Sequence, residues 1–150
     1  YRKVPRVRIS HSPPSNGLSL KTKAVFYCSY FMKKKTLVLG ASPKPDRYGY
    51  KAVERLTNFG HPVFAYGIRS GKIGEVLISS EWTNDEFDTV TLYLNPTRQE
   101  EYYDRIIALN PKRVIFNPGT ENPIFESMLS ENGIEHEQAC TLVLLNIGAY

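Results

Sequence analysis

The residues of this chain best suited to bind a ligand lie in one short loop, residues 40–49. The loop begins with Gly40-Ala41-Ser42, directly after an aliphatic run, and it also contains Lys44 and Arg47. A glycine at the end of a strand lets the backbone turn tightly and approach a ligand. Ser42 offers a hydroxyl, and both cations can neutralise phosphate charge, Arg47 through two parallel hydrogen bonds. This combination predicts a phosphate-binding turn followed by a helix whose N-terminus also favours anions.

The loop departs from the glycine pattern of NAD enzymes. That pattern is G-x-G-x-x-G, and counted from Gly40 the two later positions are Ser42 and Pro45. NAD enzymes also place an acid at the end of the second strand, where it binds a ribose hydroxyl. Here the corresponding segment is Tyr66-Gly67-Ile68-Arg69, and no acid follows it until Glu75. We therefore do not expect a plain NAD enzyme.

Two cations, Arg69 and Lys72, follow the expected second strand instead of an acid. They indicate a ligand with an additional phosphate on or near its ribose. NADP carries such a phosphate at the 2′ position and coenzyme A carries one at the 3′ position, so these residues leave both ligands open. The chain lacks a GxxxxGK[ST] motif, and an ATPase is therefore not indicated.

The remaining reactive residues form no recognisable catalytic or metal-binding set. His11, His61 and His136 do not adjoin a serine or cysteine in a nucleophile motif, and we interpret them as solvated or structural. The two cysteines, Cys28 and Cys140, show no CxxC motif and no Cys/His cluster, which argues against zinc and against a disulfide scaffold. We expect no catalytic residue and no metal site.

Cys140 is the one reactive side chain expected at the ligand edge, directly before the helix that begins at Thr141. A helix N-terminus lowers the pKa of a thiol, so one interpretation is a nucleophile or a site of mixed-disulfide formation. The alternative is a small residue packed beneath the helix. We favour the second interpretation because free cysteine is commonly buried.

Strands and helices alternate from Thr36 onward, while residues 67–88 follow no clear pattern. Apolar and β-branched runs predict strands at residues 36–39, 62–66, 89–94, 113–116 and 134–137. Apolar residues at helical spacing predict four helices, which cover residues 52–59, 97–109, 123–132 and 141–147. The second helix begins with the capping-box pattern of residues 97–100, and the third has Asn122 as its N-cap.

Five strands separated by helices, with no hairpin signal between them, predict a three-layer Rossmann-like α/β domain with a five-stranded parallel sheet. Ligands of such sheets bind beyond the carboxyl ends of the strands, near the point where the strand order reverses. The loops expected at that edge comprise residues 40–49, 67–74, 95–97, 117–121 and 138–141.

Basic residues are concentrated at the start of the chain. The formal net charge is +4, but the first 35 residues hold nine of the 19 lysines and arginines and no acid. The rest of the chain has more acids than bases, so we expect no nucleic-acid partner. Residues 1–20 lack periodicity, and we expect residues 1–31 to be disordered or a non-native extension of a domain that covers residues 32–150. A natural flexible tail is the alternative.

The apolar stretch at residues 24–32 is too short for a membrane span, which needs roughly 20 residues. Lys33-Lys34-Lys35 follows it, and this is the wrong flank for a secretory signal. We expect a cytoplasmic protein without a membrane partner, present as a monomer or a homodimer.

From Lys35 onward the chain resembles the stand-alone CoA-binding domain proteins, which are small relatives of the nucleotide-binding domain of succinyl-CoA synthetase. The resemblance rests on five short motifs that occur in the family's order. They are Leu37-Val38-Leu39-Gly40-Ala41-Ser42-Pro43 with Arg47 and Tyr48, Gly74-Glu75, the strand that ends in Asn95-Pro96, Asn117-Pro118-Gly119, and Ala139-Cys140-Thr141-Leu142.

The resemblance implies a small protein that binds coenzyme A or acyl-CoA without catalysis, since the ligase parts of the synthetase lie outside this domain. It places phosphate contacts at the Gly40–Ser42 turn and Arg47, and the adenosine near residues 66–72. An NADP-type oxidoreductase is the alternative. The candidate binding residues are Gly40, Ala41, Ser42, Lys44, Arg47, Tyr48, Tyr66, Gly67, Arg69, Lys72, Leu94, Asn95, Pro96, Asn117, Gly119 and Cys140.

Overall fold

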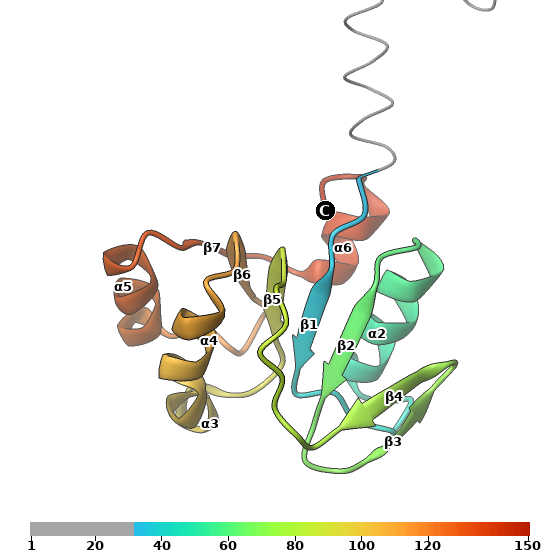
Figure 1. Ribbon diagram of the computed structural model, residues 1–150. Helices are drawn as coiled ribbons and strands as arrows, with labels where there is room; N and C mark the ends of the chain where they lie inside the picture. Colours follow the sequence, from blue (N-terminus) through green and yellow to red (C-terminus); the bar gives the residue numbers. More distant parts are fainter. Residues whose placement is uncertain (1–31) are drawn as a thin grey trace, which may run out of the picture. The chain divides into compact units, whose positions relative to one another are not determined.

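Parallel strands form most of the sheet in the computed structural model, which describes residues 32–150 (Figure 1). The strand order is β3-β4-β2-β1-β5-β6-β7. The strands are β1 (Thr36–Leu39), β2 (Val63–Tyr66), β3 (Gly71–Ile73), β4 (Val76–Ser79), β5 (Thr89–Leu92), β6 (Arg113–Phe116) and β7 (Glu135–Gln138). The Rossmann-like α/β prediction is confirmed. The prediction of five strands is wrong, because the sheet has seven.

The two additional strands, β3 and β4, form an antiparallel hairpin within the segment that showed no pattern in the sequence. Ile73 pairs with Val76, so the turn consists of Gly74 and Glu75 alone. Gly74 has φ +59°, and a glycine at the first central position is typical of a type II′ hairpin turn. The strands are too short for an alternating pattern to be visible, and this explains why no hairpin signal was apparent in the sequence here.

The helices lie close to their expected positions, with corrected boundaries. They are α2 (Tyr48–Asn58), α3 (Pro96–Gln99), the 3₁₀ turn η2 (Glu100–Tyr102), α4 (Tyr103–Leu109), α5 (Pro123–Glu131) and α6 (Thr141–Asn146). The capping box predicted at residues 97–100 is wrong. Asn95 is the N-cap, its side chain accepts the Arg98 N–H at 3.1 Å, and Pro96 is the first helical residue. β5 ends at Leu92 instead of Leu94, since the chain turns toward this cap.

Two cores, one on each face of the sheet, make the domain three-layered, as predicted (Figure 1). Leu37 and Leu39 of β1 pack into the core that includes α4 and α5, whereas Val38 packs into the core that includes α2 and α6. Successive side chains of a strand point to opposite faces, so a run of apolar residues serves both cores. None of the helices within residues 32–150 is long and apolar enough to cross a membrane.

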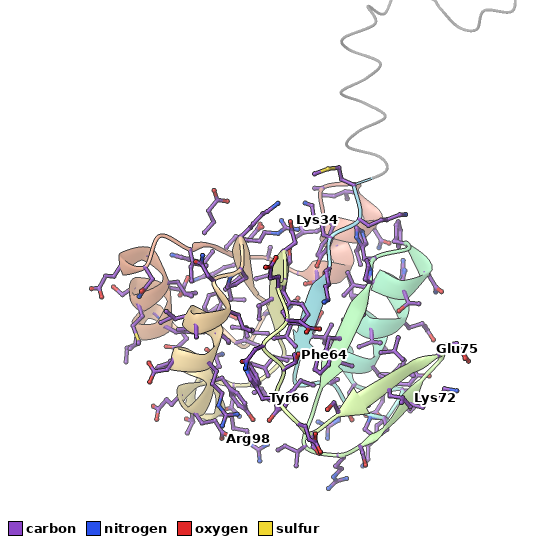
Figure 2. The ribbon with its side chains drawn as sticks, viewed as in Figure 1. Lys34, Phe64, Tyr66, Lys72, Glu75 and Arg98 are labelled. Carbon is purple, nitrogen blue, oxygen red and sulfur yellow. The ribbon has the colours of Figure 1, made fainter. Side chains whose placement is uncertain are left out.

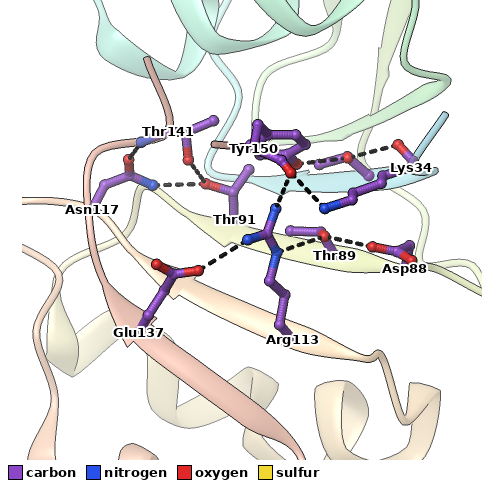
Figure 3. A network of polar contacts seen from close by, with 10 residues as sticks. Lys34, Asp88, Thr89, Thr91, Arg113, Asn117, Glu137, Thr141 and Tyr150 are labelled. Carbon is purple, nitrogen blue, oxygen red and sulfur yellow. Dashed lines mark hydrogen bonds and ion pairs between the residues drawn. The ribbon is translucent and has the colours of Figure 1, made fainter. Parts of the chain in front are cut away.

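The amino ends of the strands are held by an ionic network at the edge away from the predicted site (Figure 3). The Arg113 guanidinium donates to Glu137 at 3.0 Å, to the Thr89 hydroxyl at 3.1 Å and to the Tyr150 carbonyl at 3.2 Å. Lys34 donates to the same Tyr150 carbonyl. This network fixes the segment after α6 against β5 and β6.

The strand order reverses between β1 and β5. From β1 the chain continues to β2 on one side, and it returns to β5 on the other. The last residues of the two strands, Leu39 and Leu92, lie in register. Loops that leave the sheet here diverge, and in folds of this type the resulting crevice is where ligands bind.

Candidate functional site

A cavity of about 270 Å³ opens at the carboxyl ends of β1, β2 and β5. It therefore lies at the reversal of strand order, where the sequence analysis placed the ligand. Its lining residues are Gly40, Tyr66, Gly67, Ile68, Leu94, Arg98, Glu101 and Tyr102. The structure brings together four of the predicted residues, namely Gly40, Tyr66, Gly67 and Leu94. Four others, Ile68, Arg98, Glu101 and Tyr102, were not among the candidates.

Gly40 forms the floor of this cavity, and the position tolerates no other residue without strain. Its φ is +102°, a conformation that L side chains rarely adopt. An added Cβ would also lie 2.9 Å from the Tyr93 carbonyl carbon and 3.1 Å from the Leu94 side chain. The N–H groups of Gly40 and Ala41 donate to the Tyr66 carbonyl at 3.0 and 2.9 Å. These two groups are thus engaged in holding the loop to β2.

The start of α2 packs directly on this turn. A Cβ at Gly49 would lie 2.6 Å from the Gly40 carbonyl oxygen, and one at Gly67 would overlap the Ala41 carbonyl oxygen. The N-cap residue of α2, Arg47, makes no side-chain cap hydrogen bond, and the first turn contains no acid. The positive end of this eleven-residue helix therefore has neither a side-chain cap nor an acid in its first turn, and it packs on the turn that contains Gly40. This packing role of Gly49 was not predicted from the sequence.

The predicted cations of loop 40–49 do not line the cavity. Lys44 and Arg47 are exposed, and the Arg47 guanidinium lies 3.7 Å from the carboxylate of the neighbouring Asp46. Ser42 accepts the Lys44 N–H at 3.3 Å. Tyr48 is also exposed, and the Lys51 amine lies 5.2 Å from its ring centre. A phosphate bound by these side chains would therefore lie outside the cavity wall.

Arg69 and Lys72, predicted to bind a ribose phosphate, are not part of the cavity wall. Lys72 lies on β3, and its amine pairs with Glu75 at 3.6 Å. Figure 2 shows Lys72 and Glu75 on the hairpin, well away from Arg98. The cation that does line the cavity is Arg98.

Asn117 is buried, and its side chain is fully used within the protein (Figure 3). Its amide donates to the Thr91 hydroxyl at 2.7 Å and to the Leu92 carbonyl at 3.0 Å, and it accepts the Thr141 N–H at 2.8 Å. Cys140 is the half-buried N-cap residue of α6, a helix of only six residues. Both residues thus connect α6 to the sheet, and neither lines the cavity.

The loop after β6 already holds a carboxylate. The N–H groups of Gly119 and Thr120 donate to the Glu121 carboxylate, the second at 2.9 Å. Backbone N–H groups, first that of Glu121 itself, lower the pKa of this carboxyl below its usual value. Gly119, with φ +90°, supplies the turn in which these groups meet the carboxylate. A ligand anion at this loop would compete with the Glu121 carboxylate.

An aromatic cluster supports one wall of the cavity. The rings of Tyr66, Trp82 and Tyr102 contact one another with centroid distances of 5.3 to 5.8 Å. The Arg105 guanidinium lies over Trp82 at 5.5 Å and over Tyr102 at 5.8 Å. Burial, with Tyr66 and Glu101 nearby, raises the pKa of Tyr102. Trp82 comes from the segment without periodicity, so no pattern in the sequence linked it to the site.

His136 lies in a chain of polar contacts between α5 and β7. The Ser130 hydroxyl is 2.9 Å from Nε2 of His136, and a Glu126 oxygen is 3.7 Å from Nδ1. Ser130 lies in the last turn of α5, where the backbone N–H groups bond within the helix and cannot form an oxyanion hole. We interpret the contacts among Glu126, Ser130 and His136 as structural, since they hold α5 against β7. In the described range 32–150 no group of three or more His, Cys, Asp or Glu residues is placed to hold a metal.

Comparison with known proteins adds a family and several related folds. The model of a family described as "CoA binding domain" matches residues 34–146. A crystal structure of an uncharacterized protein is 50% identical, with a TM-score of 0.77 over 79% of this chain and 99% of that one. No curated protein matches this chain.

More distant structures share the fold alone. One comes from Thermus thermophilus, with 20% identity and a TM-score of 0.71 over 85% of this chain and 98% of that one. A hypothetical protein from Pyrococcus horikoshii has 24% identity and a TM-score of 0.67, over 88% and 93% of the two chains.

Proposed function

The chain belongs to the family of CoA binding domains, and from this we propose that it binds coenzyme A or an acyl-CoA. The observation on which the proposal rests is the cavity at the reversal of strand order, lined by Gly40, Tyr66 and Leu94. Its volume of about 270 Å³ suits the nucleoside end of the ligand better than the whole molecule. The aromatic wall formed by Tyr66 and Tyr102 offers ring contacts to an adenine.

The pyrophosphate of the ligand would then lie along the outer side of loop 40–49. The uncapped N-terminus of α2 offers backbone N–H groups and the positive end of the helix dipole. Lys44 and Arg47 are exposed beside it and can form charge-assisted hydrogen bonds. The pantetheine arm continues past this loop toward solvent.

We further propose that binding occurs without chemical conversion, as in a sensor or carrier. The cavity wall contains no serine, cysteine or histidine, so a nucleophile paired with a base is not among its lining residues. The proposal predicts that acetyl-CoA remains intact when it is incubated with the protein, as followed by thiol release. Free CoA that accumulates in proportion to the protein concentration would contradict this part.

Titration calorimetry of the full chain with CoA, acetyl-CoA, NADPH and ATP tests the ligand. We expect saturable binding of CoA and acetyl-CoA. Trp82 is the one tryptophan of the chain and stacks on Tyr102, so its fluorescence should change with the same Kd. Binding of NADPH with no response to CoA would contradict the proposal and favour an NADP-type oxidoreductase.

A further inference from the structure

Two side chains of opposite charge, Arg98 and Glu101, line the cavity without an ionic partner. The Asn95 cap and Pro96 fix the residue at which α3 begins. Arg98 in α3 and Glu101 in η2 consequently lie on either side of the junction between these two short helices. Among residues 32–150, no carboxylate lies within salt-bridge distance of Arg98, and no cation lies within that distance of Glu101. The two side chains do not pair with each other either. The cavity wall thus presents a cation and an anion that have no ionic partner within residues 32–150, with Glu101 beside Tyr102.

The other arginines around the sheet are engaged or distant. Arg113 donates to three partners, and Arg55 donates to Asn146. Arg105 stacks on the outer side of the aromatic cluster. Arg69 is exposed in the loop after β2 and does not line the cavity. Arg98 therefore has hydrogen-bond donors available for a ligand and lines the same cavity as Tyr66. Figure 2 labels both residues.

The chemistry of this pair suits a phosphorylated ribose. A guanidinium binds a phosphate through two parallel hydrogen bonds. In dinucleotide-binding folds a carboxylate at the end of the second strand accepts a hydrogen bond from a ribose hydroxyl, and here Glu101 supplies a carboxylate to the cavity from η2. Two such groups side by side complement a ring that bears a phosphate on one hydroxyl and leaves the adjacent hydroxyl free. Coenzyme A has this arrangement, with a 3′-phosphate next to a free 2′-hydroxyl.

We propose that Arg98 binds the 3′-phosphate of the ligand ribose and that Glu101 accepts a hydrogen bond from its free 2′-hydroxyl. The inference rests on the proposed CoA-binding function and makes these two residues its specificity determinants. The sequence predicted that Arg69 and Lys72 bind the additional phosphate. The proposal assigns this role to residues at the junction of α3 and η2 instead. The protein should therefore distinguish CoA from dephospho-CoA, which differs only in that phosphate.

Calorimetric titration of the full chain with CoA and dephospho-CoA tests the role of Arg98. A charge-assisted hydrogen bond is worth about 1.5–3 kcal/mol, so wild type should prefer CoA by about tenfold or more. In Arg98→Gln this preference should fall to about twofold or less, while the Kd for dephospho-CoA stays unchanged. Arg69→Gln is the matched control, and it should retain the wild-type preference. Both side chains are exposed, and melting curves of the two variants should match that of wild type.

The role of Glu101 is tested with adenosine 3′,5′-bisphosphate and its 2′-deoxy analogue. Wild type should bind the ribose form several-fold more tightly than the deoxy form, because only the ribose form has the hydroxyl that donates to Glu101. Glu101→Ala should bind both forms equally. A preference that survives in Glu101→Ala would show that another group contacts the 2′-hydroxyl and would overturn the assignment of Glu101.

The CoA-binding function and the assignment of Arg98 can be contradicted separately. If wild type binds CoA and dephospho-CoA equally well, or if Arg98→Gln keeps the wild-type preference, the assignment of Arg98 is wrong and the CoA-binding function stands. If wild type binds neither compound, both the function and this inference are wrong.

Discussion

At the scale of single residues, Arg47 is an exposed cation that we propose to contact the ligand pyrophosphate. Its guanidinium is exposed, and its nearest carboxylate, that of Asp46, is 3.7 Å away and equally exposed. Such a surface pair contributes little, so the side chain can exchange this partner for a ligand phosphate at small cost.

We therefore expect Arg47→Ala to weaken CoA binding about tenfold at low salt, which corresponds to the loss of one charge-assisted hydrogen bond. The difference from wild type should shrink at high ionic strength, since salt screens exposed charges. Calorimetric titrations at two salt concentrations measure both effects. Lys112→Ala, at the amino ends of the strands, is the control. An unchanged Kd in Arg47→Ala would remove this residue from the site.

His61 illustrates a residue whose role is stability. Its Nδ1 accepts the Lys34 N–H at 3.0 Å, and its ring packs edge-on against Tyr150 at 5.0 Å. Burial, followed by the charges of Lys33 and Lys34, lowers the pKa of His61 below the ordinary value of 6.5. The unfolded chain therefore binds this proton more readily than the folded protein does.

The consequence is a loss of stability in mild acid. The contribution of neutral His61 is fully present above pH 6.5 and is lost as pH falls from there through the folded pKa. Urea unfolding at pH 8 and pH 5.5 should show a larger drop for wild type than for His61→Asn, which keeps an acceptor but does not titrate. Equal drops in the two proteins would contradict this role.

At the scale of elements, Asn117 connects three parts of the fold. Its amide joins β6 to β5 through Thr91 and the Leu92 carbonyl, and its oxygen caps the first N–H of α6. The sequence suggested a ligand contact because Asn117 directly follows a strand at the site edge. The same position suits an internal bridge, since the start of α6 lies over that edge.

We expect Asn117→Ala to destabilise the protein by about 1–3 kcal/mol, because it leaves the buried Thr141 N–H and Leu92 carbonyl without partners. The free energy of unfolding in urea measures this loss. Asn132→Ala removes only an exposed hydrogen bond at the end of α5 and should cost much less. If the two variants were equally stable, the bridge would have no energetic importance.

At the scale of the whole molecule, residues 33–150 contain both cores and the complete cavity wall. We therefore expect a chain that starts at Met32 to melt at the same temperature as the full chain and to bind CoA with the same Kd. At a CoA concentration of 100 times Kd, both forms should gain about 2.7 kcal/mol of stability. Differential scanning calorimetry with and without CoA measures these quantities. A shorter chain that melts earlier would show that residues 1–31 contribute to the fold.

The amino-acid sequence by itself determined the α/β class, the alternation of strands and helices and the edge of the sheet at which the cavity opens. These features follow from local signals. Buried aliphatic runs mark the parallel strands, helical spacing marks the amphipathic helices, and chain connectivity places the site at the carboxyl ends of the strands. Gly40 and Gly67 were predicted for this reason, whereas Tyr66 and Leu94 were implied by the family resemblance.

Only the tertiary structure decided which charges face the cavity. Lys72 and Arg98 are both exposed cations near expected ligand loops, and nothing in the sequence distinguishes them. The β3–β4 hairpin carries Lys72 away from the cavity and pairs it with Glu75, whereas the Asn95 cap aims α3 so that Arg98 joins the wall. A side chain's direction depends on how short elements pack against residues distant in the chain, and such packing leaves no periodic trace in the sequence.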